Sequence, residues 1–277
     1  MIIGLLHPGN MGSAIGARLA TAGNTVLWHP GNRSATTRKR ATEAELTAVD
    51  DLAELLSRAD IVISVCPSAA AIDVAESVGE HQYSGIFVDA NAVSPQQMQH
   101  IAGFLSEAGA TVIDAAISGP PPRDAPTAKI FLAGPNVPRS VVREILTEAG
   151  LEVEELGESP WAASALKMAL ISYQRPARML AAIAHGLADQ HGVADALVAE
   201  AVRTGNDFLA DRDALSGMAA RAWRWIPEIN EFAISLAEAG LPTDYADATA
   251  KLYQLFASDK DQWELPPAEV IQRLIAE

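Results

Sequence analysis

The first twenty residues, MIIGLLHPGNMGSAIGARLA, constrain the fold of this chain more strongly than any other segment. Met1 to Leu6 is an apolar run typical of a buried strand, and helical spacing of apolar residues begins at Ala14. The glycine-rich turn between them lets a pyrophosphate approach the backbone, and the helix N-terminus offers unpaired N–H groups. The segment therefore predicts a dinucleotide site. Its expected contacts are His7, Pro8, Gly9, Asn10, Met11 and Gly12.

The spacing of this turn departs from the pattern G-x-G-x-x-G at its first position. Gly9 and Gly12 occupy the second and third glycine places, whereas His7 occupies the first. We expect Pro8 to hold the tight turn instead, because its ring fixes φ. The alternative is an ordinary strand–helix connection of an α/β protein, and the location of the turn between a strand and a helix favours the nucleotide.

Strand-like and helix-like segments alternate through the first half of the chain. The expected strands cover residues 1–6, 25–29, 61–66, 86–90, 111–117, 129–133 and 152–156. Strands that alternate with helices predict a doubly wound parallel sheet. From Pro160 onward the pattern is helical, with one long helix to about Gln190, kinked near Pro176, and further helices at 194–209, 216–239 and 246–259. We therefore predict an α/β Rossmann domain over 1–158 and an all-α domain over 159–277.

The segment after the second expected strand predicts which nucleotide binds. An NAD site would place Asp or Glu there for the ribose hydroxyl, but the first carboxylate is Glu43. Cations and hydroxyls precede it, and an arginine can hold a 2′-phosphate with two donors. We therefore expect NADP, with a solvated basic patch on a helix as the alternative. The expected contacts are Asn32, Arg33, Ser34 and Arg38.

The formal net charge of −15 argues against nucleic acid or an anionic membrane as a partner, so an anionic cofactor needs a local basic site. The single cysteine, Cys66, excludes an intrachain disulfide and fits a reducing compartment. No apolar run approaches the roughly 20 residues of a membrane span, and no signal-type segment stands at the N-terminus. We expect a cytoplasmic protein with no metal site, because no His, Cys and Asp cluster has metal-ligand spacing.

Six motifs occur along nearly the whole chain: HPGNMG, the Asn-Arg-Ser after the second strand, VCPSAAA, VDANAVSP, DAAISGP and SALKMA. Their order and spacing resemble the β-hydroxyacid dehydrogenase family, which includes 3-hydroxyisobutyrate and 6-phosphogluconate dehydrogenases and the imine reductases. The segment AWRWIPEI resembles the C-terminal domain of a poorly characterised, 6-phosphogluconate-dehydrogenase-like branch. The resemblance implies that the helical domain binds substrate and forms a homodimer.

The resemblance also implies roles for individual residues. Lys167 matches the family's proton-shuttling lysine, and apolar neighbours on its helix would lower its pKa by desolvation; a lysine that reaches from an apolar face to water is the alternative. Ser118 and the Gly119 N–H, in a segment like the family's DxxxSGG, would bind a substrate carboxylate or hydroxyl. The expected lining of the nicotinamide side is Cys66, Pro67, Ser68 and Asn91.

Two positions depart from the family pattern near the expected substrate. Pro120 replaces the second glycine of DxxxSGG and has no N–H to donate, and Ile171 replaces an asparagine four residues after the lysine. The polar candidates one and two turns further along the same helical face are Gln174, Arg175 and Arg178. A sugar-phosphate substrate is disfavoured, because few basic residues are candidates for binding its phosphate. These are Arg123, Lys129, Arg175 and Arg178.

The sequence predicts an NADP-dependent dehydrogenase or reductase of a small polar alcohol or hydroxy acid, or of the matching carbonyl. An imine reductase on the same scaffold is one alternative, although Lys167 counts against it, and a non-catalytic NADP-binding sensor is the other. In AWRWIPEINEF we expect Trp223 and Trp225 to pack between helices, and Glu228 and Glu231 to be solvated.

Overall fold

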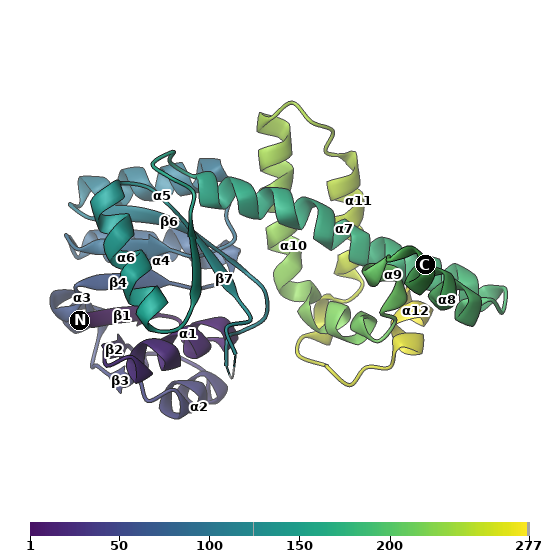
Figure 1. Ribbon diagram of the computed structural model, residues 1–277, viewed down its shortest axis with the longest axis horizontal. Helices are drawn as coiled ribbons and strands as arrows, with labels where there is room; N and C mark the ends of the chain where they lie inside the picture. Colours follow the sequence, from purple (N-terminus) through teal and green to yellow (C-terminus); the bar gives the residue numbers. More distant parts are fainter. Residues whose placement is uncertain (124, 276–277) are drawn as a thin grey trace. The chain divides into compact units, whose positions relative to one another are not determined.

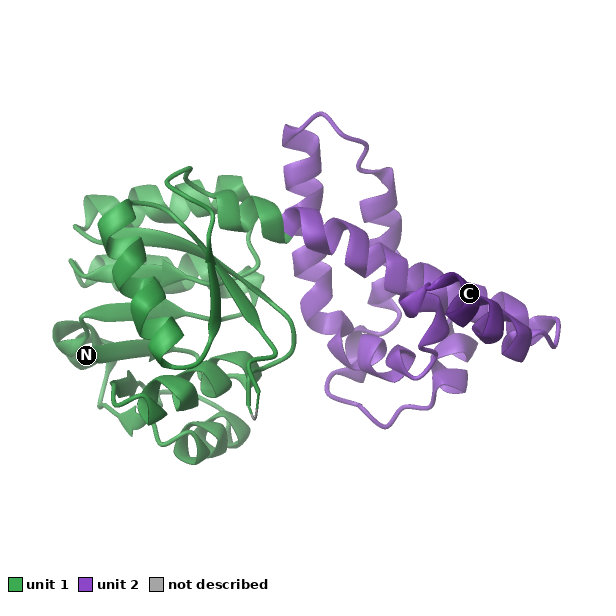
Figure 2. Ribbon diagram, viewed as in Figure 1, with its two compact units in different colours: residues 1–167 green, residues 168–277 purple. Residues whose placement is uncertain are grey.

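The computed structural model describes residues 1–123 and 125–275 of the chain. Two compact units divide it, Met1–Lys167 and Met168–Glu277, which Figure 2 shows in green and purple. The first unit carries a sheet with helices, and the second consists of helices (Figure 1).

In the described part of the first unit, eight strands form one sheet in the order β3-β2-β1-β4-β5-β6-β7-β8. The order reverses between β1 and β4, and at such a switch point the loops after the strands diverge and leave room for a ligand. The strands are β1 (Ile2–Leu6), β2 (Thr25–Trp28), β3 (Thr47–Ala48), β4 (Ile61–Ser64), β5 (Ile86–Asp89), β6 (Thr111–Ser118), β7 (Lys129–Ala133) and β8 (Glu152–Glu155).

The predicted α/β class is confirmed, with one difference in strand direction. Strand β7 runs antiparallel to β6, with Ser118 opposite Lys129. The other neighbouring strands are parallel, as predicted. The difference arises because β6 ends at Ser118 and β7 begins at Lys129, which leaves too short a connection for the crossover of a dozen or more residues that parallel strands need.

Helices cover both faces of the sheet (Figure 1). One face packs against α1 (Asn10–Thr21), α2 (Ala35–Glu43) and α6 (Asn136–Glu148). The other packs against α3 (Leu52–Arg58), α4 (Ala71–Glu80) and α5 (Pro95–Glu107). Successive residues of β1 and β4 point to opposite faces, so both faces of these strands are buried, which explains their continuous apolar sequences.

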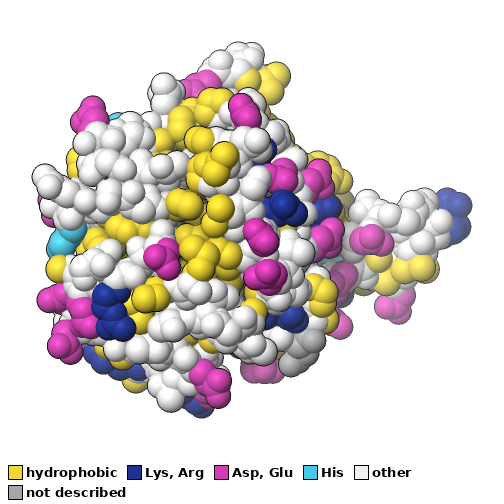
Figure 3. Space-filling model, turned by 60° about the vertical axis from the view of Figure 1, so that its left-hand side comes forward, with side chains coloured by type: hydrophobic (Ala, Val, Ile, Leu, Met, Phe, Trp, Pro, Cys, Tyr) yellow, Lys and Arg dark blue, Asp and Glu magenta, His cyan; other side chains and the backbone are white. Residues whose placement is uncertain are grey.

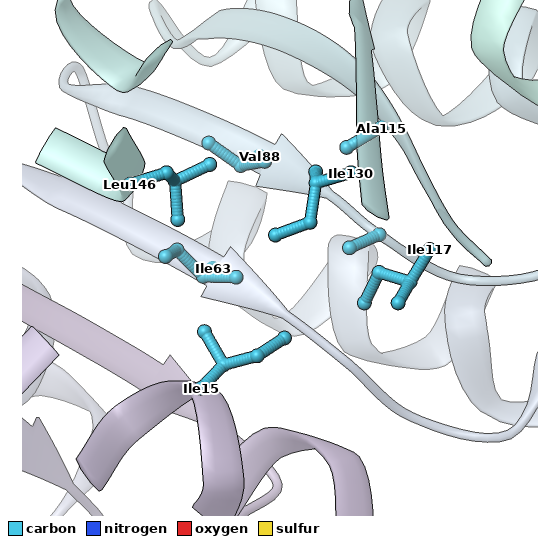
Figure 4. A pocket seen from close by; sticks show the side chains of 8 residues that line it. Ile15, Ile63, Val88, Ala115, Ile117, Ile130 and Leu146 are labelled. Atoms are coloured by element: carbon cyan, nitrogen blue, oxygen red, sulfur yellow. The ribbon is translucent and has the colours of Figure 1, made fainter. Parts of the chain in front are cut away.

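A small void lies in the core beside α1. Its volume is about 10 Å³, and the side chains that line it are apolar, among them Ile15, Ile63 and Leu146 (Figure 4). A void of this size and lining is a packing defect that holds no ligand.

Local sequence explains where several helices begin. Ser94 accepts a hydrogen bond from the Gln97 N–H at 3.2 Å, and Pro95 opens α5, so the start predicted from Ser94-Pro95 is confirmed. Asp51 caps α3 by accepting from the Glu54 N–H at 2.8 Å.

The second unit contains most of α7 (Ala162–Gln190), the long helix that begins in the first unit.

The single helix predicted over 194–209 is wrong. Helix α8 (Ala194–Thr204) ends at Thr204 because Gly205 adopts a left-handed φ of 69°. Among the described residues, no helix is long and apolar enough to cross a membrane. The remaining helices are α8 (Ala194–Thr204), α9 (Asp207–Ala210), α10 (Ala214–Glu238), α11 (Asp244–Gln254) and α12 (Pro267–Ile275).

Acidic side chains are spread among neutral and apolar ones on the face shown in Figure 3. This distribution agrees with the formal net charge of −15. The negative net charge repels anionic ligands, so a site for one needs a local cluster of cations.

Candidate functional site

The glycine turn after β1 is built around the carbonyl group of His7. His7 itself adopts a left-handed φ of 73°, so it takes the conformation that a glycine would supply, a role that the sequence assigned to Pro8. The Gly9 N–H donates to the His7 carbonyl oxygen at 2.7 Å. A Cβ on Gly12 would lie 2.5 Å from the same oxygen, so only glycine fits there.

Helix α1 begins directly after this turn, with Gly9 as its N-cap. No described side chain caps it by a hydrogen bond, so the N–H groups of its first turn are available to an external acceptor. The positive end of the helix dipole points the same way. This is the arrangement that binds a pyrophosphate.

A cavity of about 200 Å³ lies beside the turn, where the strand order reverses. Burial, and then the positive charge of Arg33, lower the pKa of His7 to about 4, so its imidazole is neutral at physiological pH. The Nδ1 atoms of His7 and His29 are buried without a hydrogen-bond partner among the described residues. The lining residues are Leu5, Leu6, His7, His29, Arg33, Leu52, Ala70, Asp73, Val74 and Ser77.

The loop after β2 presents Arg33 to this cavity. Arg38 donates to the carbonyl oxygens of Arg33 at 3.2 Å and of Gly31 at 2.5 Å, so it shapes the loop from the following helix. Ser34 caps α2 by accepting from the Thr37 N–H at 3.2 Å. Asn32 is exposed beside them. Burial lowers the pKa of Arg33, which remains a cation in a partly desolvated site.

These residues fit a dinucleotide. The turn leaves no room for a side chain at Gly12, and α1 offers uncapped N–H groups. The cavity combines apolar walls with a cation and unpartnered imidazole nitrogens. A purine nucleotide matches that mixture, because it has a flat apolar face, ring acceptors and anionic groups.

A hydrogen-bonded network closes the ends of β4 and β5. Asn91 Oδ1 accepts from the Cys66 N–H at 2.6 Å, and Asn91 Nδ2 donates to Ser64 Oγ at 3.1 Å and to Asp89 Oδ2 at 3.0 Å. Burial raises the pKa of the Cys66 thiol to about 12, so it carries no thiolate at neutral pH. Pro67 and Ser68 follow, and Ser68 Oγ is buried without a partner in the described residues.

Lys167 lies at the end of β6, beside the predicted substrate loop. Its Nζ donates to the Ile117 carbonyl oxygen at 2.7 Å, directly before Ser118. Gly119 adopts a φ of 108°, and a Cβ there would lie 2.3 Å from the Thr127 carbonyl oxygen. The structure therefore brings Lys167, Ser118 and Gly119 together at one strand end.

Asp114 ties this strand to the helix that carries Lys167. Its carboxylate accepts from Ser164 Oγ at 2.6 Å and from the Ser164 N–H at 2.9 Å. Both residues are 1% exposed. A carboxylate at a helix N-terminus also interacts favourably with the helix dipole. Asp114 thus fixes the first turn of α7 at Ser164, which lies three residues before Lys167.

Other predicted positions lie elsewhere. Ile171, 1% exposed, and Gln174 belong to the second unit. Lys129 forms ion pairs with Glu152 at 3.0 Å and Glu154 at 2.8 Å on the neighbouring strand. Arg123 donates to the Asn10 side chain at the start of α1. The expected phosphate candidates therefore do not form one set.

Two predictions for α10 have different outcomes. Trp225 is 3% exposed and packs edge-to-face on Tyr253, as expected. Glu228 and Glu231 were expected in solvent, and this is wrong: Glu228 pairs with Arg175 at 2.5 Å, and Glu231 is 8% exposed. The ion pair of Glu228 joins α10 to α7, and the spacing of charges along one helix does not reveal such a contact.

Sequence reasoning missed several residues of this site. His29 and Asp73 line the cavity, but both stood in segments assigned to plain secondary structure. Asp89, at the end of β5, and Asp114, opposite it within β6, are buried carboxyls. The carboxyl end of a strand such as β5 faces the ligand in sheets of this kind. Among the described residues, no group of His, Cys, Asp and Glu could hold a metal ion.

The chain matches two described families. Residues 2–157 match the family "NAD binding domain of 6-phosphogluconate dehydrogenase". Residues 188–256 match a domain of unknown function, DUF1932.

Two curated relatives align with part of the chain. An uncharacterised 28.5 kDa protein of Methanothermus fervidus is 30% identical over 166 residues, which cover 60% of this chain and 62% of that protein. The mitochondrial 3-hydroxyisobutyrate dehydrogenase of Drosophila melanogaster is 27% identical over 161 residues, which cover 56% of this chain and 48% of that enzyme. The alignments thus span about half to three fifths of these relatives.

Solved structures share the fold over nearly the whole chain. The conserved protein MTH1747, of unknown function and described as similar to 3-hydroxyacid dehydrogenases, is 25% identical with a TM-score of 0.69, covering 95% of this chain and 99% of that one. The Mycobacterium tuberculosis 3-hydroxyisobutyrate dehydrogenase with L-serine is 20% identical with a TM-score of 0.77, covering 99% and 98%. An imine reductase of Streptomyces aurantiacus is 20% identical with a TM-score of 0.64, covering 100% of both chains.

Proposed function

Since this chain belongs to the family of the 6-phosphogluconate dehydrogenase NAD-binding domain, we propose that it is an NADP-dependent oxidoreductase of the hydroxyacid dehydrogenase type. The observation that supports this most directly is a convergence at the carboxyl edge of one sheet. The uncapped α1 N-terminus, the cavity beside Arg33, and Lys167 beside Ser118 all lie there.

The 2′-phosphate of NADP would be held by Arg33. Its guanidinium lines the cavity, and Arg38 holds the loop that carries it through two backbone carbonyl groups. Asn32 and Ser34 flank it with polar groups. Asp73 also lines the cavity, but it stands on α4 and not at the end of β2, where an NAD enzyme carries its carboxylate.

Bound NADP supplies a hydride acceptor, and NADPH a hydride donor, for one carbon of the substrate. As hydride leaves the carbinol carbon of an alcohol, the hydroxyl proton must leave as well, and Lys167 Nζ takes it as general base. In the reverse direction Lys167 returns the proton to the carbonyl oxygen. Asp114 positions this lysine through its cap on α7, and the Ile117 carbonyl group orients its Nζ.

The substrate is proposed to be a small polar alcohol or hydroxy acid, or the matching carbonyl compound. Ser118 Oγ and the Gly119 N–H, next to Lys167, would hydrogen-bond its carboxylate or hydroxyl group. Gln174 is the next polar side chain along the face of α7, and Ile171 makes that face less polar than in the family pattern.

We further propose a homodimer. Apolar side chains recur on one face of α7 at intervals of two helical turns, and they are exposed: Tyr173 (67%), Leu180 (64%) and Leu187 (64%). A second copy of the chain would cover this stripe.

The proposal is tested by titrating the purified protein with NADPH and NADH while following nicotinamide fluorescence. We expect NADPH to bind at least about tenfold more tightly, because the 2′-phosphate adds a charge-assisted contact with Arg33. Arg33→Gln should remove this preference and leave NADH binding nearly unchanged. Arg58→Gln, which loses only an exposed pair with Glu54, is the matched control.

A protein that binds neither nucleotide would refute the proposal. If NADPH binds, hydroxy acids, aldehydes and imines are then screened for turnover. Reduction of imines alone would assign the chain to imine chemistry, and nucleotide binding without turnover of any of these classes would favour a sensor.

A further inference from the structure

Four arginines of the second unit stand on two helices that are joined by the Arg175–Glu228 ion pair and by contacts of Arg175 and Arg221 with one Trp225 ring, and we call them the arginine cluster. They are Arg175 and Arg178 from α7, and Arg221 and Arg224 from α10. Burial is the main cause that lowers the pKa of Arg221 to about 10, and repulsion by the charges of the other three arginines adds to it. Burial is also the main cause of the lowered pKa of Arg178, and the charge of Arg175 adds to it.

Aromatic rings hold the guanidinium groups of the cluster. The guanidinium carbons of Arg175 and Arg221 lie 4.3 Å and 5.9 Å from the centre of the Trp225 ring. Arg221 also lies 4.6 Å from the Trp263 ring. On α9, the Phe208 ring lies 4.7 Å from the guanidinium carbon of Arg178. Such stacking fixes the planes of the cations, so they are preorganised.

Carboxylates balance the cluster only in part. Glu228 forms an ion pair with Arg175 at 2.5 Å. Glu228 and then Asp261 also act on Arg224, and Asp211 acts on Arg178, without forming ion pairs with them. In the part of the chain that the structure describes, no carboxylate pairs directly with the other three arginines. A partly buried cation without a counter-charge is costly, and a bound anion would relieve that cost.

A further donor lies inside the cluster. The Nε1 atom of Trp225 is buried and has no hydrogen-bond acceptor among the described residues, and the residue is 3% exposed. A buried indole N–H normally finds an acceptor. One Arg221 N–H donates to the Gly217 carbonyl oxygen at 2.9 Å. Among the described residues, the remaining donors of the cluster outnumber their acceptors, and all of them suit oxygen atoms.

We propose that Arg178 and Arg221, with Arg175 and the Trp225 N–H behind them, bind a phosphate or phosphonate group of a small molecule. A guanidinium group can donate two parallel hydrogen bonds to two oxygens of such a group. A phosphate dianion has three oxygens and can accept from several guanidinium groups at once, whereas a carboxylate has only two oxygens. The net charge of −15 makes a polyanionic macromolecule an unsuitable occupant. That this molecule is the substrate of hydride transfer rests on the proposed function, whereas the anion site does not.

The site is tested by calorimetric titration of the nucleotide-free protein with inorganic phosphate, and with acetate as a carboxylate probe, at matched ionic strength. We expect phosphate to bind clearly and acetate about tenfold more weakly. Arg178→Gln and Arg221→Gln should each weaken phosphate binding about tenfold, whereas Arg221→Lys, which keeps the charge but loses the fork, should weaken it less. Arg175 is not substituted, because its removal would leave the Glu228 carboxylate without its ion-pair partner.

Two further variants separate this site from others. Arg203→Gln, which disrupts an exposed pair with Glu200, should bind phosphate like the wild type. Inorganic phosphate can also occupy the nucleotide site beside Arg33. Arg33→Gln removes that part of the binding, and the part that remains belongs to the arginine cluster. The proposal is overturned if the wild type binds no phosphate, if acetate binds equally well, if Arg33→Gln abolishes the binding, or if folded Arg178→Gln and Arg221→Gln proteins retain it. Thermal unfolding of each variant establishes that it is folded.

Discussion

Lys167 on α7 donates a 2.7 Å hydrogen bond to the carbonyl oxygen of Ile117, the residue before Ser118. If Lys167 transfers the substrate proton, Lys167→Ala should lower kcat by about a hundredfold or more, within the range attributed to general acid–base catalysis. Nucleotide affinity should stay within about twofold of the wild type, because Lys167 is not among the residues that line the cavity beside Arg33. Steady-state kinetics with the substrate found by screening, together with NADPH titration, measure both, and Lys251→Ala on α11 is the control. Unchanged turnover in Lys167→Ala would exclude this role.

Glycine variants separate the fold of the turn from its binding function. Gly12→Ala places a Cβ 2.5 Å from the His7 carbonyl oxygen and should cost about 1–3 kcal/mol of unfolding free energy as well as nucleotide binding. Gly9→Ala meets no described atom closer than 4.0 Å, and its φ of −70° suits alanine, so it should fold normally but bind nucleotide more weakly. Urea unfolding and NADPH titration give the two readouts. Equal loss of stability in both variants would contradict the steric argument.

Local signals predicted much of the first unit. The apolar run of β1, the glycines of the turn and the Ser94-Pro95 start of α5 depend on residues close in sequence, and the structure contains all three. The family and the α/β class followed from such motifs in order along the chain. Gly205 is also a local signal, typical of a helix C-terminus, and it would have divided the helix predicted over 194–209.

Long-range contacts were beyond the reach of the sequence. The antiparallel direction of β7 depends on its pairing with β6, and no periodicity along β7 encodes that pairing. Asp114 and Ser164 are fifty residues apart in the chain but 2.6 Å apart in space. The arginine cluster assembles from two helices, so Arg221 and Arg224 were not among the residues considered for a phosphate.

The Asp114–Ser164 contact should stabilise the start of α7. Asp114→Ala leaves the buried Ser164 hydroxyl and N–H without this acceptor, and we expect a loss of about 2–4 kcal/mol. Ser164→Ala removes only the hydroxyl donor and should cost about 1 kcal/mol. The double variant should cost less than the sum, which urea unfolding of all four proteins measures. Strict additivity would mean that the two side chains do not interact.

The apolar stripe on α7 predicts an assembly in solution. Leu187→Asp, alone or with Leu180→Asp, should convert a dimer to a monomer, because a carboxylate in an apolar interface is desolvated without a partner. Val202→Asp, on α8 and 66% exposed, places the same charge on another apolar residue and should leave the dimer intact. Light scattering coupled to size exclusion measures the mass. A monomeric wild type would refute the dimer.

The carboxyl group of Asp89 should make stability depend on pH. Burial raises its pKa from an ordinary value near 3.8 to about 7, against opposing hydrogen bonds from Asn91. Between these two pKa values the folded protein retains a proton that the unfolded chain has released, so the free energy of unfolding falls as pH rises, by at most roughly 1.4 kcal/mol per pH unit. Asp89→Asn has no proton to lose, so its stability should fall less between about pH 4 and 7 than that of the wild type. Asp114, the carboxyl opposite it on β6, stays in both proteins, and its own burial-raised pKa contributes to both slopes. Urea unfolding at several pH values gives the two curves, and parallel curves would show that Asp89 is ionised in the folded protein across this range.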